Sequence, residues 1–214
     1  MSVDARDMMK NMLGNMSTLQ DKDSINRLRL RGAARTIIEA CGEDPDREGL
    51  RETPNRVARA MQELTTGYHN DIMEEMTTFA ADGADQMVCQ WNIPLYSLCE
   101  HHLLPFAGFA HIGYIPRDSV VGLSKFKRVV DHFARRFQIQ ERLTREIADL
   151  LHSVLEPRGV MVVVEAEHFC MTMRGVQAPG TLTTTSAVTG DFLDTAEGSR
   201  QEFLTLLNRN RKER

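Results

Sequence analysis

Three residues with metal-ligating side chains, Cys99, His102 and Cys170, lie in two short stretches far apart in the chain. Cys99 and His102 form a C-x-x-H pair, a spacing at which a thiolate and an imidazole converge on one ion, and Cys170 can supply a third ligand. Three protein ligands leave one tetrahedral position open on zinc, where water binds and loses a proton near neutral pH. The pattern therefore predicts a catalytic zinc site and hydrolytic chemistry.

Two further imidazoles, His101 and His168, stand one or two residues from these ligands. Histidine titrates near neutral pH, so both side chains suit proton transfer beside a metal. Alternatively, His101 or His168 is a fourth ligand, which would close the site and make the zinc structural. The spacing leaves both interpretations open, together with the ordinary one that a buried cysteine is a small apolar residue.

The predicted metal turn lies between two segments that have the pattern of half-buried strands. Apolar residues alternate with their neighbours from Met87 to Ile93, and residues 106–115 are interpreted as the returning strand. Residues 99–102 would then lie at one end of a sheet, where a rigid scaffold holds them. We interpret His111, inside the returning strand, as a packed or surface residue rather than a ligand.

Two amphipathic helices are predicted next, because apolar residues recur at helical spacing over residues 123–137 and 143–155. Three more strands are expected at residues 160–164, 169–174 and 181–189. This order predicts an α+β fold in which a helix pair covers one face of an antiparallel sheet.

The residues before the sheet are predicted to form a helical extension. Residues 1–22 have no firm period and are interpreted as a mobile arm or a marginal helix. Helical spacing begins near residue 24 and ends at Gly42, and Thr53-Pro54 begins a second helix. We therefore divide the chain into an arm (1–22), an N-terminal helical region (23–84) and a catalytic domain (85–214).

The composition of the 214-residue chain argues against several classes of protein. A net charge of -4 is unlike that of a general nucleic-acid binder, and no apolar run approaches the roughly 20 residues that span a membrane. Four cysteines without a disulfide framework and the lack of a signal region indicate a cytoplasmic protein, with Cys41 and Cys89 as core residues. The basic residues near the end are interpreted as a solvated tail: Arg209, Arg211, Lys212 and Arg214.

Several short stretches resemble the sequences of GTP cyclohydrolase I, the zinc enzyme family that opens the purine ring of GTP. The resemblance runs in the family's order from about residue 25 to residue 207, with a looser match at residues 49–58. The matching stretches are residues 99–102 (CEHH), 111–116 (HIGYIP), 122–125 (GLSK), 138–144 (QIQERLT), 168–171 (HFCM) and 173–175 (MRG).

The resemblance implies zinc as the cofactor, GTP as the substrate, and a role for each matched residue. Cys99, His102 and Cys170 would hold the metal. Glu141 and Gln140 would read the guanine edge, since a carboxylate can accept from both the ring N–H and the exocyclic amine. The implied catalytic groups are His101, His168 and Ser124, and the implied ribose and triphosphate contacts are Ser124, Lys125, Arg128, Arg174, Arg56 and Arg59.

The residues themselves leave ordinary alternatives for these positions. Guanidinium forks and an ammonium group suit a triphosphate, although Arg56 and Arg59, three residues apart on a helix, also fit a solvated face. Glu141 likewise fits the start of a helix, where negative charge is favourable. In the implied reaction, zinc-activated water attacks C8 of the purine, C8 leaves as formate, and rearrangement of the ribose gives 7,8-dihydroneopterin triphosphate.

The resemblance also implies the tunnelling fold, in which the sheets of several subunits join into a barrel. Pairing of open sheet edges between subunits would produce a homo-oligomer, a decamer of two pentamers in the family. Two other functions compete with the cyclohydrolase. One is a different tunnelling-fold enzyme of pterin or deazapurine chemistry, and the other is a non-catalytic nucleotide-binding relative with a structural zinc.

Overall fold

The computed structural model describes the chain except for residues 1–4, 195, 197 and 213–214. It divides into two compact units, Met1–Glu63 and Leu64–Arg214. Within the described part of the chain, no helix combines the length and the apolar character that crossing a membrane requires.

The first unit is built around two helices, α1 (Ala5–Ala40) and α2 (Thr53–Leu64). Gly42 follows α1 with a φ of 85°, a left-handed conformation that glycine adopts readily and that ends the helix. The arm predicted for residues 1–22 belongs to α1 from Ala5 onward, and its first four residues lie outside the described ones. Cys41 is exposed, so its interpretation as a core residue was wrong.

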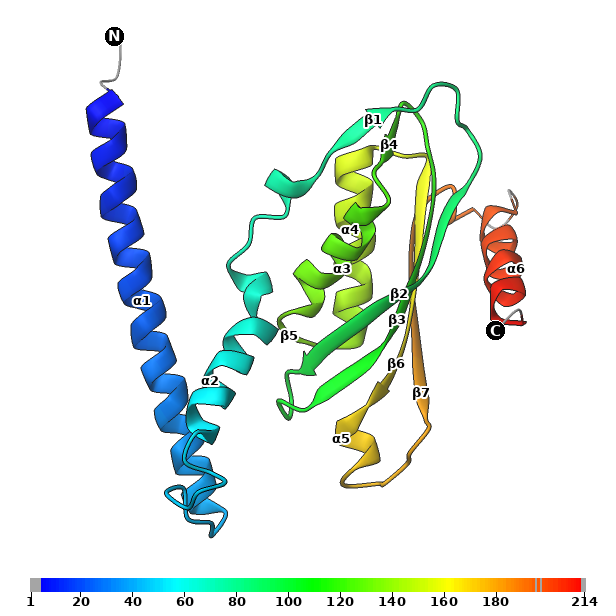
Figure 1. The fold of residues 1–214 in the computed structure, drawn as a ribbon. Coiled ribbons are helices and arrows are strands. Elements are labelled where there is room, and N and C mark those ends of the chain that lie inside the picture. The colour runs from blue at the N-terminus through cyan, green and yellow to red at the C-terminus, as the bar shows by residue number, and fades with distance from the viewer. Residues whose placement is uncertain (1–4, 195, 197, 213–214) are drawn as a thin grey trace. The chain divides into compact units, whose positions relative to one another are not determined.

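The second unit contains a five-stranded sheet with the strand order β5-β2-β3-β6-β7 (Figure 1). The four long strands pair antiparallel, as predicted, whereas the short β5 pairs parallel to β2. A separate antiparallel pair joins β1 to β4. The strand bounds are β1 Thr78–Ala80, β2 Val88–Cys99, β3 Pro105–Ile115, β4 Ser119–Val121, β5 Phe137–Gln138, β6 Gly159–His168 and β7 Leu182–Gly190. Two short 3-10 helices, η1 (Thr66–Tyr68) and η2 (Met73–Glu75), precede β1.

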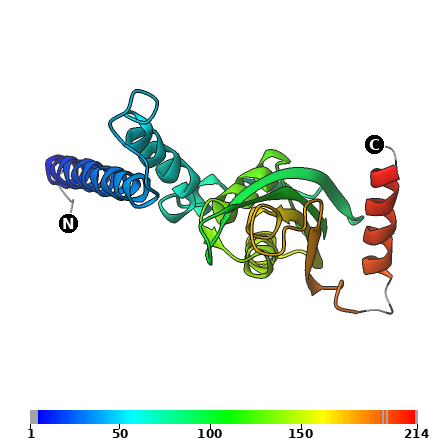
Figure 2. The same cartoon turned by 90° about the horizontal axis from the view of Figure 1, so that it is seen from below.

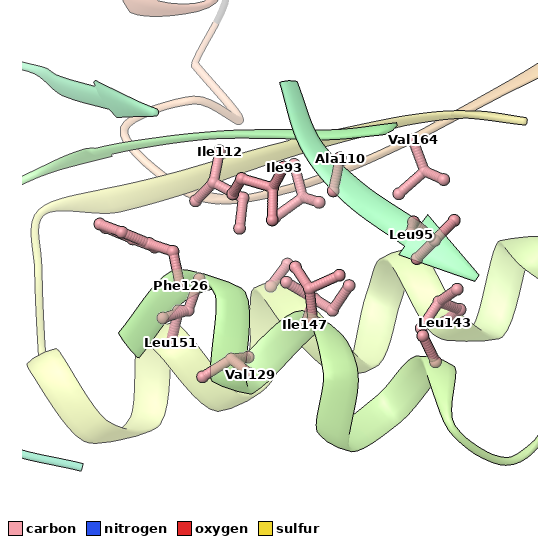
Figure 3. Packing of buried hydrophobic residues seen from close by; sticks show 14 of the residues in the cluster. Ile93, Leu95, Ala110, Ile112, Phe126, Val129, Leu143, Ile147, Leu151 and Val164 are labelled. Carbon is pink, nitrogen blue, oxygen red and sulfur yellow. The ribbon is translucent and has the colours of Figure 1, made fainter. Parts of the chain in front are cut away.

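The main core lies between one face of the sheet and the helices α3 (Ser124–Ala134) and α4 (Gln140–Leu155). Figure 3 shows the side chains of both layers meeting in this core. The predicted helix pair on one sheet face is confirmed. The labelled core residues are Ile93, Leu95, Ala110, Ile112 and Val164 from the strands and Phe126, Val129, Leu143, Ile147 and Leu151 from the helices.

The strand predicted for residues 169–174 was wrong. This segment begins with the short helix α5 (Phe169–Thr172), and Met173 N donates to Phe169 O at 3.2 Å. Its large apolar side chains, Phe169, Met171 and Met173, are 38%, 37% and 62% exposed. None of them is buried against the sheet, so they do not hold the segment in a strand, and the chain turns after β6.

The last helix, α6 (Ser199–Lys212), was not predicted and covers the face of the sheet opposite α3 and α4 (Figure 2). The basic residues interpreted as a solvated tail, Arg209, Arg211 and Lys212, lie in its last turn and are exposed. Phe203 and Leu207, one helical turn apart, are buried against Met161 and Val163 of β6. A Cβ on Gly113 would lie 2.5 Å from Phe203, so only glycine allows this close approach. Arg214 lies outside the described residues.

Candidate metal centre and cavity

The turn between β2 and β3 holds two of the predicted metal ligands. Cys99 N donates to Leu104 O and Leu103 N donates to Cys99 O, both at 2.8 Å. Leu103 adopts a φ of 55°, which allows the chain to reverse within this short connection. The side chain of Cys99 is buried and that of His102 is exposed, with Cys99 Sγ 3.9 Å from His102 Nδ1.

The third predicted ligand, Cys170, comes from α5 at the end of β6. Phe106 pairs with His168 across β3 and β6, so the sheet brings this segment beside the β2–β3 turn. The potential ligand atoms of Cys99, His102 and Cys170 all lie within 4.8 Å of one another. Three residues from two separate segments of the chain therefore form one group that can hold a metal ion.

The chemistry of this group suits a soft divalent cation. Burial, reinforced by the adjacent Cys99, raises the pKa of the Cys170 thiol. A bound cation would offset this penalty, because it stabilises thiolates directly. Two sulfur atoms and one imidazole nitrogen are ligands typical of zinc, and three protein ligands leave a fourth position open.

His101 lies beside the group as well, with its Nδ1 3.8 Å from Cys99 Sγ. Its ring and that of His102 are nearly perpendicular, at 76°, with centroids 6.2 Å apart. His101 is exposed and lines a cavity of about 230 Å³ that also contains Cys99, Cys170 and His168. The structure thus brings both predicted catalytic histidines into contact with the same cavity.

His168 is held by a hydrogen bond and by stacking. Its Nε2 lies 2.8 Å from Gln140 Oε1, and its ring stacks on Phe106 with centroids 4.6 Å apart and planes inclined by 7°. The Gln140 amide is itself oriented, because its Nε2 donates to Val164 O at 3.0 Å and to Thr183 O at 2.9 Å. Oε1 therefore faces His168, which must donate from Nε2 and leaves Nδ1 as an acceptor in the neutral ring.

Electrostatics favour the neutral form of His168. Burial lowers the pKa of the ring, and the carboxylate of Glu141 opposes that shift only in part. Glu141 is exposed in the first turn of α4 and lines the cavity together with Gln138 and Gln140. A carboxylate at the cavity wall can accept hydrogen bonds from a ligand that presents N–H groups.

One supporting contact was not identified from the sequence. Arg142 pairs with Glu100, which tethers the β2–β3 turn to α4, and Arg142 Nε donates to Gln138 Oε1 at 2.8 Å. Glu100 N also donates to Gln138 O at 3.0 Å. Glu100, Gln138 and Arg142 all lie in the stretches that resemble the family, and nothing else in the sequence indicated this contact.

Other predicted site residues lie at the opposite end of the sheet. Tyr114 OH accepts from Val121 N at 3.4 Å, and the Tyr114 ring is 5.8 Å from that of Phe126 in the first turn of α3. Tyr114 is eight residues along β3 from Phe106, which corresponds to about 27 Å of strand. Ser124 and Lys125, in the first turn of α3, therefore lie far from the metal group within one chain, and Arg128, one turn further along, pairs with Glu75 at 2.9 Å.

The remaining predicted arginines fall in two places. Arg174 is exposed just after α5, and its charge lowers the pKa of Cys170 slightly against the larger effects of burial and Cys99. Arg56 and Arg59 are both exposed on α2, in the first compact unit.

Comparison with known proteins identifies the family. The family model for GTP cyclohydrolase I matches residues 30–208. The chain belongs to the GTP cyclohydrolase I family. The matched residues cover nearly the whole second unit and part of the first.

Curated relatives agree with this assignment. The chain is 52% identical over 185 residues to GTP cyclohydrolase 1 of Thermoanaerobacter pseudethanolicus, a match that covers 86% of this chain and 98% of the relative. It is 53% identical over 184 residues to the Carboxydothermus hydrogenoformans protein of that name, covering 86% and 95%. The Mycolicibacterium vanbaalenii protein of that name is 54% identical over 186 residues, covering 86% and 92%.

A solved structure of an archaeosine synthase QueF-Like in the apo form also matches, with 22% identity and a TM-score of 0.39. The match covers 49% of this chain and 93% of that one. A similarity this low carries no argument about function.

Proposed function

We propose that this chain is a zinc-dependent GTP cyclohydrolase that opens the purine ring of GTP at C8, releases formate and forms 7,8-dihydroneopterin triphosphate. Membership of the family makes the chain a hydrolase of the GTP cyclohydrolase 1 type. The observation that carries the zinc-dependent reaction is the convergence of Cys99, His102 and Cys170 at a cavity lined by two histidines. Zinc, when bound, supplies Lewis-acid chemistry that activates water at neutral pH.

The two histidines are proposed to divide the proton transfers. His168 is half-buried, favours the neutral form and presents Nδ1 as an acceptor, so it is suited to taking a proton. His101 is exposed at the cavity and is proposed to donate a proton to N7 of the purine, which makes C8 electrophilic. This division refines the sequence-based interpretation, in which either histidine could serve as the acid.

Glu141 is proposed to select guanine. Its exposed carboxylate lies on the wall of the cavity, where it can accept from the ring N–H and the exocyclic amine of the base. Adenine does not present this pair of donors, and a site built for hydrogen bonding rejects a base that lacks them. Gln140 is proposed to contact guanine only through its backbone, because its side-chain amide already makes hydrogen bonds to His168 and to two backbone carbonyls.

The triphosphate is proposed to be held by Lys125, Arg128 and Ser124 of a neighbouring subunit, with Arg174 of the same chain and with Arg56 and Arg59. This proposal is supported by the separation of about 27 Å along β3 between the metal end and the α3 end of the sheet, longer than one nucleotide can bridge with close contacts. A composite site requires an oligomer, and the decamer of two pentamers implied by the family provides one. The cytoplasmic location expected from the sequence is part of the same proposal.

The test of activity is an assay with GTP and ATP that follows formate release and pterin formation together. GTP is expected to yield both products and ATP neither. Glu141→Gln should raise KM for GTP at least about tenfold, because the N–H donors of the bound guanine lose their charged acceptor. Glu156→Gln, at the other end of the same helix, is the matched control and should leave KM unchanged. GTP left intact by the zinc-loaded protein would overturn the proposal.

The composite site is tested by mixing two inactive variants, Lys125→Ala and Cys170→Ser, during expression. If each site combines two chains, random mixing restores up to about one quarter of the wild-type activity, because some sites receive both intact halves. No recovery, with mixed oligomers demonstrated by tagged chains, would mean that each site belongs to a single chain.

A further inference from the structure

A second cavity lies on the face of the sheet that α6 covers, away from the metal group. Its volume is about 440 Å³, within the range of small-molecule sites. β6 and β7 form its floor, α6 forms one wall, and Arg145 of α4 reaches its rim. Figure 1 shows α6 and the α3–α4 pair on opposite sides of the sheet. The proposed GTP reaction uses no residue of this cavity.

The spacing of residues along α6 explains why the cavity exists. Phe203 and Leu207 are buried against β3 and β6, so the helix is anchored at the middle of the sheet. Arg200, Leu204 and Asn208 recur every four residues and therefore share a neighbouring face of the helix, which lines the cavity. On β7, Ser186 lines the cavity with a small side chain.

The cavity has an apolar middle and a positively charged end. Met161 and Val163, both 3% exposed, and Leu204 supply the apolar surface. Arg145 Nη1 donates to Val188 O at 3.3 Å, and Val188 pairs with Met161, which places Arg145 at the same end as the start of α6. Arg145 Nη1 lies 3.7 Å from Asp149 Oδ1, which is longer than a hydrogen bond.

Arg200 supplies the decisive observation. Its Nε is buried and has no hydrogen-bond partner among the residues that the structure describes. A buried guanidinium N–H without an acceptor is costly, so this position favours an anionic acceptor from outside the chain. At the other end of the cavity, Arg211 is paired with Glu165 and therefore does not need an acceptor from outside the chain.

We propose that this cavity binds a small organic anion with one oxyanion head and an apolar body. The carboxylate, sulfonate or phosphate head accepts hydrogen bonds from Arg200 and Arg145, and the apolar body lies on Met161, Val163 and Leu204. Guanidinium groups suit such a head because they donate in a fixed fork. A nucleoside triphosphate does not fit, because its charge would extend over the apolar surface.

The experiment uses the full-length protein and the aromatic sulfonate 8-anilinonaphthalene-1-sulfonate as the probe. Fluorescence and calorimetric titrations are expected to give one saturable site per chain. Arg200→Gln and Arg145→Gln should each weaken binding by about tenfold or more, because each removes a charge-assisted hydrogen bond. Lys212→Gln removes the same charge from α6 at a position that does not line the cavity, and it should leave the affinity unchanged.

A second variant, Ser186→Phe, tests the apolar part of the cavity without changing its charge. The added ring fills the space and should abolish saturable binding, and a thermal melt shows whether this variant is folded. If it does not fold, the arginine variants still decide the question. Equal affinity in Arg200→Gln and wild type, or no saturable binding by wild type because another copy of the chain fills the cavity, would overturn the proposal. Neither result bears on GTP turnover, which is assayed separately.

Discussion

Replacing Gln140 by methionine, which keeps the length of the side chain and removes its polar atoms, tests how the site positions His168. Gln140 is 2% exposed and makes hydrogen bonds to His168, Val164 O and Thr183 O at 2.8–3.0 Å. Its Nε2 also lies 3.2 Å from Thr185 Oγ1. The variant therefore removes a network of contacts that joins α4 to β6 and β7.

The size of the effect follows from these contacts. A lost hydrogen bond costs roughly 1 kcal/mol net, and a buried group left unpaired costs about 1–3 kcal/mol. Gln140→Met should thus lower the free energy of unfolding by about 2–4 kcal/mol, measured by urea titration at one fixed protein concentration. Thr185→Val is the control, because it loses the contacts of Thr185 Oγ1 to Gln140 Nε2 and to Thr144 Oγ1 and leaves the His168 bond intact; it should cost about 1–2 kcal/mol.

Kinetics separate the two roles that Gln140 can have. If its side chain orients His168, kcat for GTP falls about 10- to 100-fold in Gln140→Met while KM changes little. Thr185→Val should keep the wild-type kcat. An unchanged kcat with a raised KM would refute this reasoning and would mean that the side chain reads the guanine, as the family resemblance first implied.

Three further predictions concern single residues. Burial and a neighbouring guanidinium lower the pKa of His132 below its ordinary value of 6.5. As the pH falls, the unfolded chain therefore binds a proton at this histidine at a higher pH than the folded chain does. The free energy of unfolding decreases below about pH 6.5 by up to about 1.4 kcal/mol per pH unit, and His132→Asn should flatten this slope in urea titrations. Burial raises the pKa of Cys89 to about 12, so iodoacetamide at pH 8 should modify the exposed Cys41 and spare Cys89, as peptide mass spectrometry would show. His101→Ala should retain zinc and lose turnover, whereas His102→Ala should lose zinc; the reverse pattern of metal content would exchange their roles.

Much of the second unit could be predicted from periodicity. The strands β2, β3 and β6 and the helices α3 and α4 each carry an apolar pattern, which the sheet and its helix pair then bury, and β7 was predicted from its threonine-rich sequence. The strand prediction failed at Phe169–Thr172, where the large apolar side chains are not buried. Helix α6 was not predicted, because its buried Phe203 and Leu207 stand among charged residues.

The site could be predicted only in part, because pairings between distant elements have no local signal. The metal group followed from ligand types and spacing together with the family resemblance. The bond between Gln140 and His168, 28 residues apart, depends on α4 packing against β6, and no pattern within either segment reveals it. The separation of Ser124 from Cys99 likewise depends on the direction in which α3 crosses the sheet.

The most direct test of the account measures metal content and GTP turnover on the same sample. Protein is analysed as purified, after removal of metal with a chelator, and after zinc is restored, with formate and 7,8-dihydroneopterin triphosphate followed together. We expect one zinc per chain and equal amounts of the two products, both lost with the metal and both recovered with zinc. Full activity in the metal-free protein, or zinc bound in every chain with GTP left intact, would contradict it.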